Sequence, residues 1–287
     1  MIIFHPVTLT RQAEEKLVQI ETNIVYGMYS GLALLLDIYR PVQANGFGII
    51  HISGSGWSAP LGPDAQPLKA SRHVEIEGKP LVEAGYTLFT INHRATPRFP
   101  YPAAVEDAQR AVRYVRYHAH AFGIHADRIG AIGGSSGGHL VSLLGLLPGN
   151  GDPADESPIN QVSARVQCLV TRAAPSNFLT YFPPPLFLGV ALRPDMSPQS
   201  LEYRRAQAAS PLTYVTPDAP PCFLIHGDAD DVVPIDQSAQ MEAALRKAGV
   251  PVQFRRVAGA GHGPGIMDDA AIGAAVVEWF DRHLQGA

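Results

Sequence analysis

The stretch AIGGSSGGHL, residues 131–140, places two adjacent serines between two pairs of glycines. An apolar run at 128–132 leads into it and is typical of a buried strand, and the apolar sequence that follows is typical of a helix. A strand, the pattern G-x-S-x-G and a helix together predict a nucleophile elbow, a strained turn that exposes a serine hydroxyl. The pattern fits in two registers, one centred on Ser135 and the other on Ser136.

The flanking residues favour Ser135 as the nucleophile of this elbow. In that register Gly133 directly follows the strand, and two further glycines open the helix. In the other register the strand would run one residue further, and the bulky His139 would enter the first helical turn. A glycine-rich turn can also hold a phosphate, but the chain lacks both G-x-x-x-x-G-K-[ST] and a G-x-G-x-x-G that opens a helix after the first strand. A phosphate site is therefore the weaker interpretation.

Apolar runs along the chain predict a sheet of eight strands. The runs are at residues 24–28, 32–39, 47–52, 86–91, 128–132, 166–170, 222–226 and 252–257. The first two suit an antiparallel start, and most later runs are continuously apolar, as in a parallel sheet that is covered on both faces. Helical patterns lie between them, at residues 72–84, 102–122, 137–147, 235–248 and 268–284. The alternation predicts a three-layer α/β sandwich with a mostly parallel sheet and helices on both faces.

The clearest helical pattern, at residues 102–122, has apolar residues at intervals of three and four. Arg110, Arg113 and Arg116 lie off this apolar stripe, and we expect them to form a solvated face. The formal net charge of −4 gives no reason to interpret them as a nucleic-acid patch.

We expect residues 1–287 to form a single domain, which is long enough for a large core. Residues 172–220 are rich in proline, include the sequence FPPPL, and predict an excursion that forms a cap or pocket. Residues 1–20 form an N-terminal segment that we expect to pack near this cap. A helix over residues 10–20, capped by Thr10, is predicted within it.

Composition excludes several classes of protein. Hydrophobic residues make up 46% of the chain and charged residues 17%, which is typical of a globular protein with no preference for nucleic acid. No apolar run reaches the roughly 18 residues of a transmembrane segment. The chain shows no secretory signal, so we expect a cytoplasmic location, with secretion still open. Cys168 and Cys222 are expected to be buried thiols, and no ligand spacing indicates a metal site.

A serine hydroxyl needs a base to take its proton, and the chain offers one after the last strand. His262 lies there in the glycine-rich sequence GAGHGPG. The preceding strand is followed by three carboxylates, those of Asp228, Asp230 and Asp231. Because the carboxyl ends of parallel strands share one edge of a sheet, these groups can meet Ser135 there. The chain order Ser, Asp, His is the one expected of this architecture.

Three blocks of sequence resemble α/β-hydrolases of the carboxylesterase type, related to hormone-sensitive lipases and to feruloyl and acetyl-xylan esterases. The blocks are INHRATPRFPYPAAVEDAQRAVRYV, DRIGAIGGSSGGHL and ASPLTYVTPDAPPCFLIHGDADDVVP. The match at G-x-S-x-G-G-H-L supports Ser135. In the family pattern H-G-x-x-D-x-x-V-P the acid falls on Asp230, which leaves Asp228 and Asp231 as turn or supporting residues. The resemblance implies a triad of Ser135, Asp230 and His262.

The sequence departs from this family in the loop that supplies oxyanion donors. The family usually has H-G-G-G-W after the third strand, whereas this chain has SGSGW. The resemblance implies that the donors are backbone N–H groups, those of Ser55, Gly56 and Ser136. It also places Gly54 and Trp57 among the residues that bind substrate. The side chain of Ser55 is expected to lie where the acyl or alcohol group passes.

Other residues near these motifs are expected to have supporting roles. His139 is expected to pack near the nucleophile rather than to react, and His226 to support the acid loop. Trp57 and the segment from Phe182 to Phe187 either line an acyl pocket or cover the core, and the sequence leaves both alternatives open.

The resemblance implies a serine-dependent hydrolase that acts on short- to medium-chain carboxylic esters through an acyl-enzyme intermediate. Its partner is a small-molecule ester, no cofactor is needed, and a homo-oligomer is left open. A peptidase or an acyltransferase with the same triad is the alternative function. A non-catalytic binding protein with a hydrolase fold is disfavoured, because all three triad residue types are present.

Overall fold

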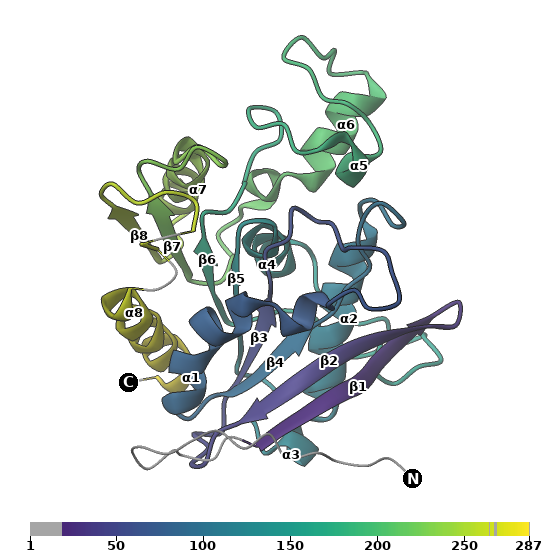
Figure 1. The fold of residues 1–287 in the computed structure, drawn as a ribbon, viewed down its shortest axis with the longest axis vertical. Coiled ribbons are helices and arrows are strands. Elements are labelled where there is room, and N and C mark those ends of the chain that lie inside the picture. Colours follow the sequence, from purple (N-terminus) through teal and green to yellow (C-terminus); the bar gives the residue numbers. More distant parts are fainter. Residues whose placement is uncertain (1–18, 264, 267–268, 287) are drawn as a thin grey trace.

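The computed structural model of the protein describes residues 19–263, 265–266 and 269–286 (Figure 1). Its centre is an eight-stranded sheet in the order β1-β2-β4-β3-β5-β6-β7-β8. The strands are β1 (Gln19–Tyr29), β2 (Leu32–Arg40), β3 (Gly48–Ile52), β4 (Thr87–Ile91), β5 (Ile129–Gly134), β6 (Cys168–Arg172), β7 (Cys222–Gly227) and β8 (Val252–Val257). The pairs β1–β2 and β2–β4 are antiparallel and the others are parallel. The predicted mostly parallel sheet with an antiparallel start is confirmed.

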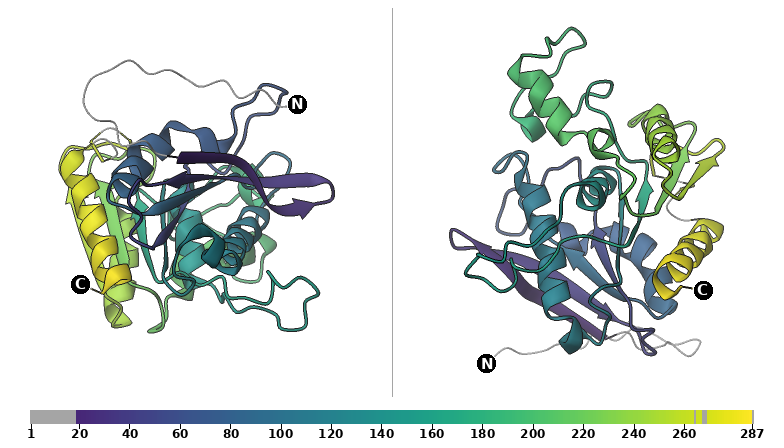
Figure 2. Two further views of the ribbon diagram at one scale, coloured as in Figure 1. Left: turned by 90° about the horizontal axis from the view of Figure 1, so that it is seen from below. Right: turned by 180° about the vertical axis from the view of Figure 1, so that it is seen from behind.

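Helices cover both faces of the sheet (Figure 2). They are α1 (Lys79–Glu83), α2 (Ala103–Tyr117), α3 (Ala119–Phe122), α4 (Ser136–Leu146), α5 (Pro185–Leu188), α6 (Leu201–Ala209), α7 (Asp236–Lys247) and α8 (Ala270–Phe280). Buried side chains of α1 and α8, such as Leu81 and Phe280, form the core on one face. Those of α2, α4 and α7, such as Val112, Leu144 and Leu245, form the core on the other. The two cores make the predicted three-layer sandwich.

Two predicted helices differ in detail from those in the structure. The helix predicted at residues 102–122 is divided into α2 and α3 at His118, which leaves the helical conformation with φ −95° and ψ 12°. The helix predicted at residues 268–284 begins at Ala270, because the side chain of Asp269 caps it. The helix predicted near the N-terminus lies outside the described residues, apart from its last two residues, which belong to β1.

The arginines of α2 contact a loop as well as solvent. Arg113 Nε donates to the Val162 carbonyl at 3.1 Å, and Arg116 Nη2 donates to the Arg165 carbonyl at 2.6 Å. Arg110 Nη1 donates to a side-chain amide oxygen of the same loop at 2.6 Å. The predicted solvated face is only partly exposed. The three half-buried guanidinium groups satisfy polar atoms of the loop between α4 and β6.

Residues 172–220, the predicted excursion, contain α5 and α6 and rise above the carboxyl ends of the central strands (Figure 1). Tyr101, just before α2, holds this segment by two bonds. Its N–H donates to the Phe187 carbonyl at 2.7 Å, and its hydroxyl donates to the Ala208 carbonyl at 2.7 Å.

Among the described residues, no helix combines the length and the apolar character that crossing a membrane requires.

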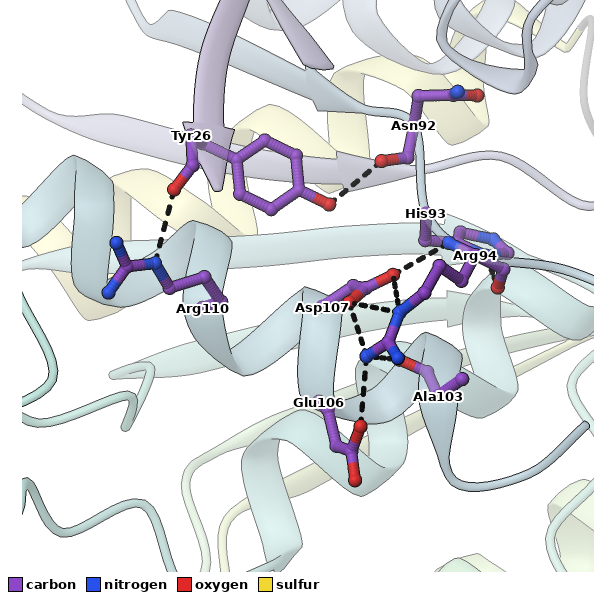
Figure 3. Close-up of polar contacts among 8 residues, drawn as sticks. All are labelled: Tyr26, Asn92, His93, Arg94, Ala103, Glu106, Asp107 and Arg110. Carbon is purple, nitrogen blue, oxygen red and sulfur yellow. Dashed lines mark hydrogen bonds and ion pairs between the residues drawn. The ribbon is translucent and has the colours of Figure 1, made fainter. Parts of the chain in front are cut away.

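A buried ion pair ties the segment after β4 to α2 (Figure 3). Arg94 Nε donates to Asp107 Oδ1 at 2.9 Å, and the Arg94 backbone N–H donates to Asp107 Oδ2 at 2.6 Å. Arg94 Nη2 also donates to Glu106 Oε2 at 2.9 Å, but the Glu106 side chain is 58% exposed against 2% for Asp107. Further along this segment, the Thr96 N–H donates to the Trp57 carbonyl at 2.9 Å. The ion pair therefore also supports the loop that follows β3.

Asp107→Ala should lower the free energy of unfolding by about 3–5 kcal/mol, because it leaves a buried arginine without its main partner. Glu106→Ala removes the exposed partner of the same guanidinium and should cost less than about 1 kcal/mol. Urea unfolding of both variants and the wild type measures the two losses. Equal losses would contradict the conclusion that only the buried carboxylate constrains the fold.

Candidate active site

Ser135 lies on a sharp turn between β5 and α4, with φ 53° and ψ −127°. A non-glycine residue at positive φ is strained by about 1–3 kcal/mol, and such strain is concentrated at functional sites. The positions two residues before and after Ser135 cannot carry side chains. A Cβ at Gly137 would lie 2.0 Å from the Ile52 carbonyl oxygen, and one at Gly133 would lie 2.6 Å from the same atom. The strained position of the elbow is thus occupied by Ser135, and Ser136 is the first residue of the helix.

The imidazole of His262 connects this serine to a carboxylate. His262 Nε2 lies 2.9 Å from Ser135 Oγ, and His262 Nδ1 lies 2.8 Å from Asp230 Oδ2. An ionised carboxylate can only accept, so Nδ1 carries the ring proton and Nε2 accepts from the serine hydroxyl. The three residues follow β5, β7 and β8, whose carboxyl ends lie at one edge of the sheet. The structure thus brings together the three side chains that the sequence singled out.

Asp230 is held by donors on both of its carboxylate oxygens. Its Oδ1 accepts from the N–H groups of Val232 at 2.9 Å and Val233 at 2.8 Å. Its Oδ2, besides the bond to His262, lies 3.2 Å from His226 Nε2. The carboxylate is fully buried, so these contacts fix its orientation toward the imidazole.

The residues around this acid have different contacts. Asp228 Oδ1 accepts from the Gly259 N–H at 2.7 Å and so joins two loops, whereas Asp231 is exposed. His226 is fully buried, with Nδ1 2.7 Å from Ser238 Oγ. Burial lowers the pKa of His226, so the ring stays neutral, and its Nε2–H donates to the Val233 carbonyl at 2.9 Å beside the acid. Of the three carboxylates in this loop, Asp230 alone contacts the imidazole of the site.

The loop after β3 makes a tight turn, with positive φ at Gly56 (61°) and Trp57 (58°). The Ser55 carbonyl accepts from the Ser58 N–H at 3.3 Å and from the Ser58 hydroxyl at 2.9 Å. The Ser55 N–H donates to Ser136 Oγ at 2.8 Å, so this predicted oxyanion donor is engaged by a side chain. Across the described part of the chain, the N–H groups of Gly56 and Ser136 have no hydrogen-bond partner. These two donors are therefore available to a bound oxygen atom.

Gly54 brings the same loop against the elbow. A Cβ at this position would lie 2.8 Å from the Gly134 carbonyl oxygen and 3.1 Å from Ser135 Cβ, so a side chain does not fit. The Gly54 N–H donates to His73 Nδ1 at 3.3 Å. Burial lowers the pKa of His73, which keeps its imidazole neutral beside the site. No sequence motif marks His73, and only its contact with this loop reveals it.

Trp57 is packed beneath the excursion, with 3% of its surface exposed. Its indole stacks on the Phe187 ring at 4.4 Å between centroids and meets the Phe178 ring edge-on at 5.7 Å. Its Nε1–H donates to His139 Nδ1 at 3.0 Å, so His139 packs as expected. Phe182, in contrast, is 40% exposed. The sequence left open whether these aromatic residues line an acyl pocket or cover the core. In the structure, Trp57 and Phe187 cover the core.

Other reactive groups do not compete with this serine. Within residues 19–263, 265–266 and 269–286, no group of three or more His, Cys, Asp or Glu side chains could hold a metal ion. Cys168 and Cys222 are free and buried, as predicted. Burial raises the pKa of both thiols, which makes them poor nucleophiles at neutral pH. The nucleophile that the geometry offers is the Ser135 hydroxyl.

In an α/β-hydrolase the nucleophile follows a central strand, and the acid and the histidine follow later ones, which is the arrangement in this chain. The fold and the site therefore define an α/β-hydrolase. More narrowly, the chain belongs to the BD-FAE family, whose model matches residues 36–245. This match includes the elbow and the acid loop and ends before His262.

The relatives of the chain are esterases. A probable carboxylic ester hydrolase of Mycobacterium tuberculosis, LipM, is 32% identical over 233 residues, which cover 78% of this chain and 51% of LipM. The chain spans about half the length of the curated relatives it matches. A truncated carbohydrate esterase from gut microbiota has a TM-score of 0.76 and 29% identity, over 95% of this chain and 99% of its own. An acetyl ester-xyloside bifunctional hydrolase from Caldicellulosiruptor lactoaceticus has a TM-score of 0.73 and 25% identity, over 90% and 95%.

A fluorophosphonate probe should label the wild-type protein on Ser135, because the imidazole 2.9 Å away can take the hydroxyl proton. Ser135→Ala should abolish labelling. Ser136→Ala is the matched control and should retain it, because the Ser136 hydroxyl is buried against the Ser55 N–H. Intact-mass measurement and peptide mapping read out both variants. If labelling is lost in Ser136→Ala and kept in Ser135→Ala, the nucleophile is Ser136 and the other register of the motif applies.

Proposed function

We propose that the protein hydrolyses carboxylic esters of short- to medium-chain acids through an acyl-enzyme intermediate on Ser135. The observation that carries this proposal is the position of the His262 imidazole, 2.9 Å from Ser135 Oγ and 2.8 Å from Asp230 Oδ2. A serine hydroxyl in this position can lose its proton as it attacks a carbonyl carbon. The names of the relatives, which are esterases or ester hydrolases, support the same chemistry.

In the proposed reaction, Ser135 Oγ attacks the ester carbonyl carbon while His262 Nε2 takes the hydroxyl proton. Asp230 holds the imidazole in the tautomer protonated on Nδ1 and stabilises its cation. The imidazolium then gives its Nε2 proton to the leaving alcohol, and the acyl-enzyme forms. A water molecule loses a proton to the same imidazole and attacks the acyl carbon. The imidazolium then gives this proton to Ser135 Oγ as the acid leaves, which restores the serine. No cofactor takes part.

The carbonyl oxygen becomes negative in this reaction and needs donors at about 2.7–3.1 Å. The N–H groups of Gly56 and Ser136 are the proposed donors, because both lack a protein partner in the described part of the chain. The Ser55 N–H joins them once its bond to Ser136 Oγ is shared or broken. Gly54 allows this loop to approach the nucleophile. The hydrogen bond from the Trp57 indole to His139 holds the loop in place.

The surroundings of the site support a small ester as the substrate. Trp57, Phe178 and Phe187 pack against one another and fill the space beneath the excursion, which favours short acyl groups.

We propose that residues 172–220 act as the cap of a single domain. Two structural relatives are named as a carbohydrate esterase and an acetyl ester-xyloside hydrolase, which supports acetylated carbohydrates as candidate substrates.

Asp230→Asn should lower kcat for ester hydrolysis by about 10⁴-fold, because the amide cannot hold His262 in the required tautomer. Asp231→Asn changes an exposed carboxylate of the same loop and should leave kcat nearly unchanged. Hydrolysis of p-nitrophenyl acetate, with active sites counted by fluorophosphonate labelling, measures both variants. Similar losses in the two would remove Asp230 from its proposed role.

The substrate class is tested with p-nitrophenyl esters from acetate to decanoate and with amino-acid anilides. Acetate and butyrate should be cleaved fastest, because the packed aromatic residues limit the space for an acyl chain. Anilides should be cleaved far more slowly than esters. Faster cleavage of anilides would favour the peptidase alternative, and a predominance of acyl transfer to added alcohols would favour an acyltransferase.

A further inference from the structure

His139 is fully buried in the first turns of α4, and each of its ring nitrogens takes part in a hydrogen bond. The Trp57 Nε1–H donates to His139 Nδ1 at 3.0 Å, so the proton of the neutral ring is on Nε2. This Nε2–H donates to the Ala209 carbonyl at 2.8 Å. Burial lowers the pKa of His139 to about 4, so the neutral ring persists at neutral pH. Its backbone N–H donates to the Ser135 carbonyl at 3.0 Å, which places His139 directly behind the nucleophile.

Trp57 determines where the loop after β3 lies. It directly follows Gly56, and the two residues form a turn with φ 61° and 58°. The Trp57 carbonyl accepts from the Thr96 N–H at 2.9 Å and from the Thr96 hydroxyl at 3.1 Å. The indole is buried and bonded to His139. Because the main chain and the side chain of Trp57 are both held, the adjacent Gly56 N–H is held with them.

Ala209 is the last residue of α6, so His139 also contacts the excursion. The Phe178 ring lies 4.9 Å from the imidazole, and the Phe178 N–H donates to Ser210 Oγ at 2.8 Å. The Phe187 ring meets the imidazole edge-on at 5.5 Å. One imidazole therefore joins the helix of the nucleophile, the loop after β3 and the excursion.

We propose that His139 is a positioning residue for ester hydrolysis: through Trp57 it holds the Gly56 N–H at the oxyanion position, and through Ala209 it holds the excursion. This role rests on the proposed function. A phenylalanine at position 139 would fill the same space but would leave the buried indole N–H and the Ala209 carbonyl without partners. The loop would then shift, and a displaced donor weakens binding of the transition state more than binding of the substrate.

His139→Phe should lower kcat by about 10- to 100-fold with little change in KM, a smaller loss than removal of a whole oxyanion donor. His139→Gln should recover most of the activity, because its amide oxygen can accept from the indole and its amide nitrogen can donate to the Ala209 carbonyl. The readouts are kcat and KM for p-nitrophenyl acetate, the rate constant of fluorophosphonate labelling at Ser135, and the melting temperature of each variant.

Leu144→Ala is the matched control for stability. Leu144 is fully buried on the same helix, so this variant should lose thermal stability but keep kcat per labelled site. Trp57→Phe removes the indole N–H and should reproduce the effect of His139→Phe. The double variant should then add little to either single loss, because both remove the same bond.

Several outcomes would overturn the role of His139. One is a His139→Phe protein with a lower melting temperature but unchanged kcat and labelling rate. Others are a failure of glutamine to restore activity and additive losses in the double variant. A wild type that labels at Ser135 but hydrolyses no ester contradicts the proposed function alone, because labelling rates still test His139. A wild type that is not labelled at all overturns both.

Discussion

The site depends on how closely the end of β3 approaches the first turn of α4. The Ile52 carbonyl oxygen lies within 2.0 Å of where a Cβ at Gly137 would be, and within 2.6 Å of one at Gly133. Only glycine permits this crossing of two backbones. The crossing brings the strained Ser135 beside the loop at Gly54, so the nucleophile and the proposed oxyanion donors are neighbours although they come from different parts of the chain.

Charged groups as well as apolar ones are buried against the central strands of the sheet. His51 Nε2 lies 2.9 Å from one oxygen of Glu77, and the other oxygen lies 3.8 Å from Arg172 Nε. Burial acts to raise the pKa of Glu77, but the His51 bond and the Arg172 charge outweigh it and lower that pKa. The Arg172 carbonyl accepts from the Ser135 N–H at 2.7 Å. The residue whose guanidinium joins this buried cluster thus holds the elbow through its main chain.

The sequence predicts the parts of the structure that follow from local patterns. Continuous apolar runs mark strands such as β3 and β7, which are fully buried, and motifs at the strand ends locate Ser135, Asp230 and His262 at one edge. The choice among three acids came from the family resemblance, since spacing alone left it open. Contacts between a side chain and a distant backbone leave no periodic signal. The bond from the Ser55 N–H to Ser136 Oγ, which joins residues 81 positions apart, could therefore not be predicted.

The proposed base is carried by an edge strand of the sheet. His262 follows β8, which pairs only with β7 and has no fully buried residue. Edge strands with solvent-accessible backbone bonds open at a lower free energy than strands in the core. When β8 opens locally, the imidazole leaves the hydroxyl while the interior strands stay folded. On this ground, heating is expected to separate the three side chains of the site before the core melts cooperatively.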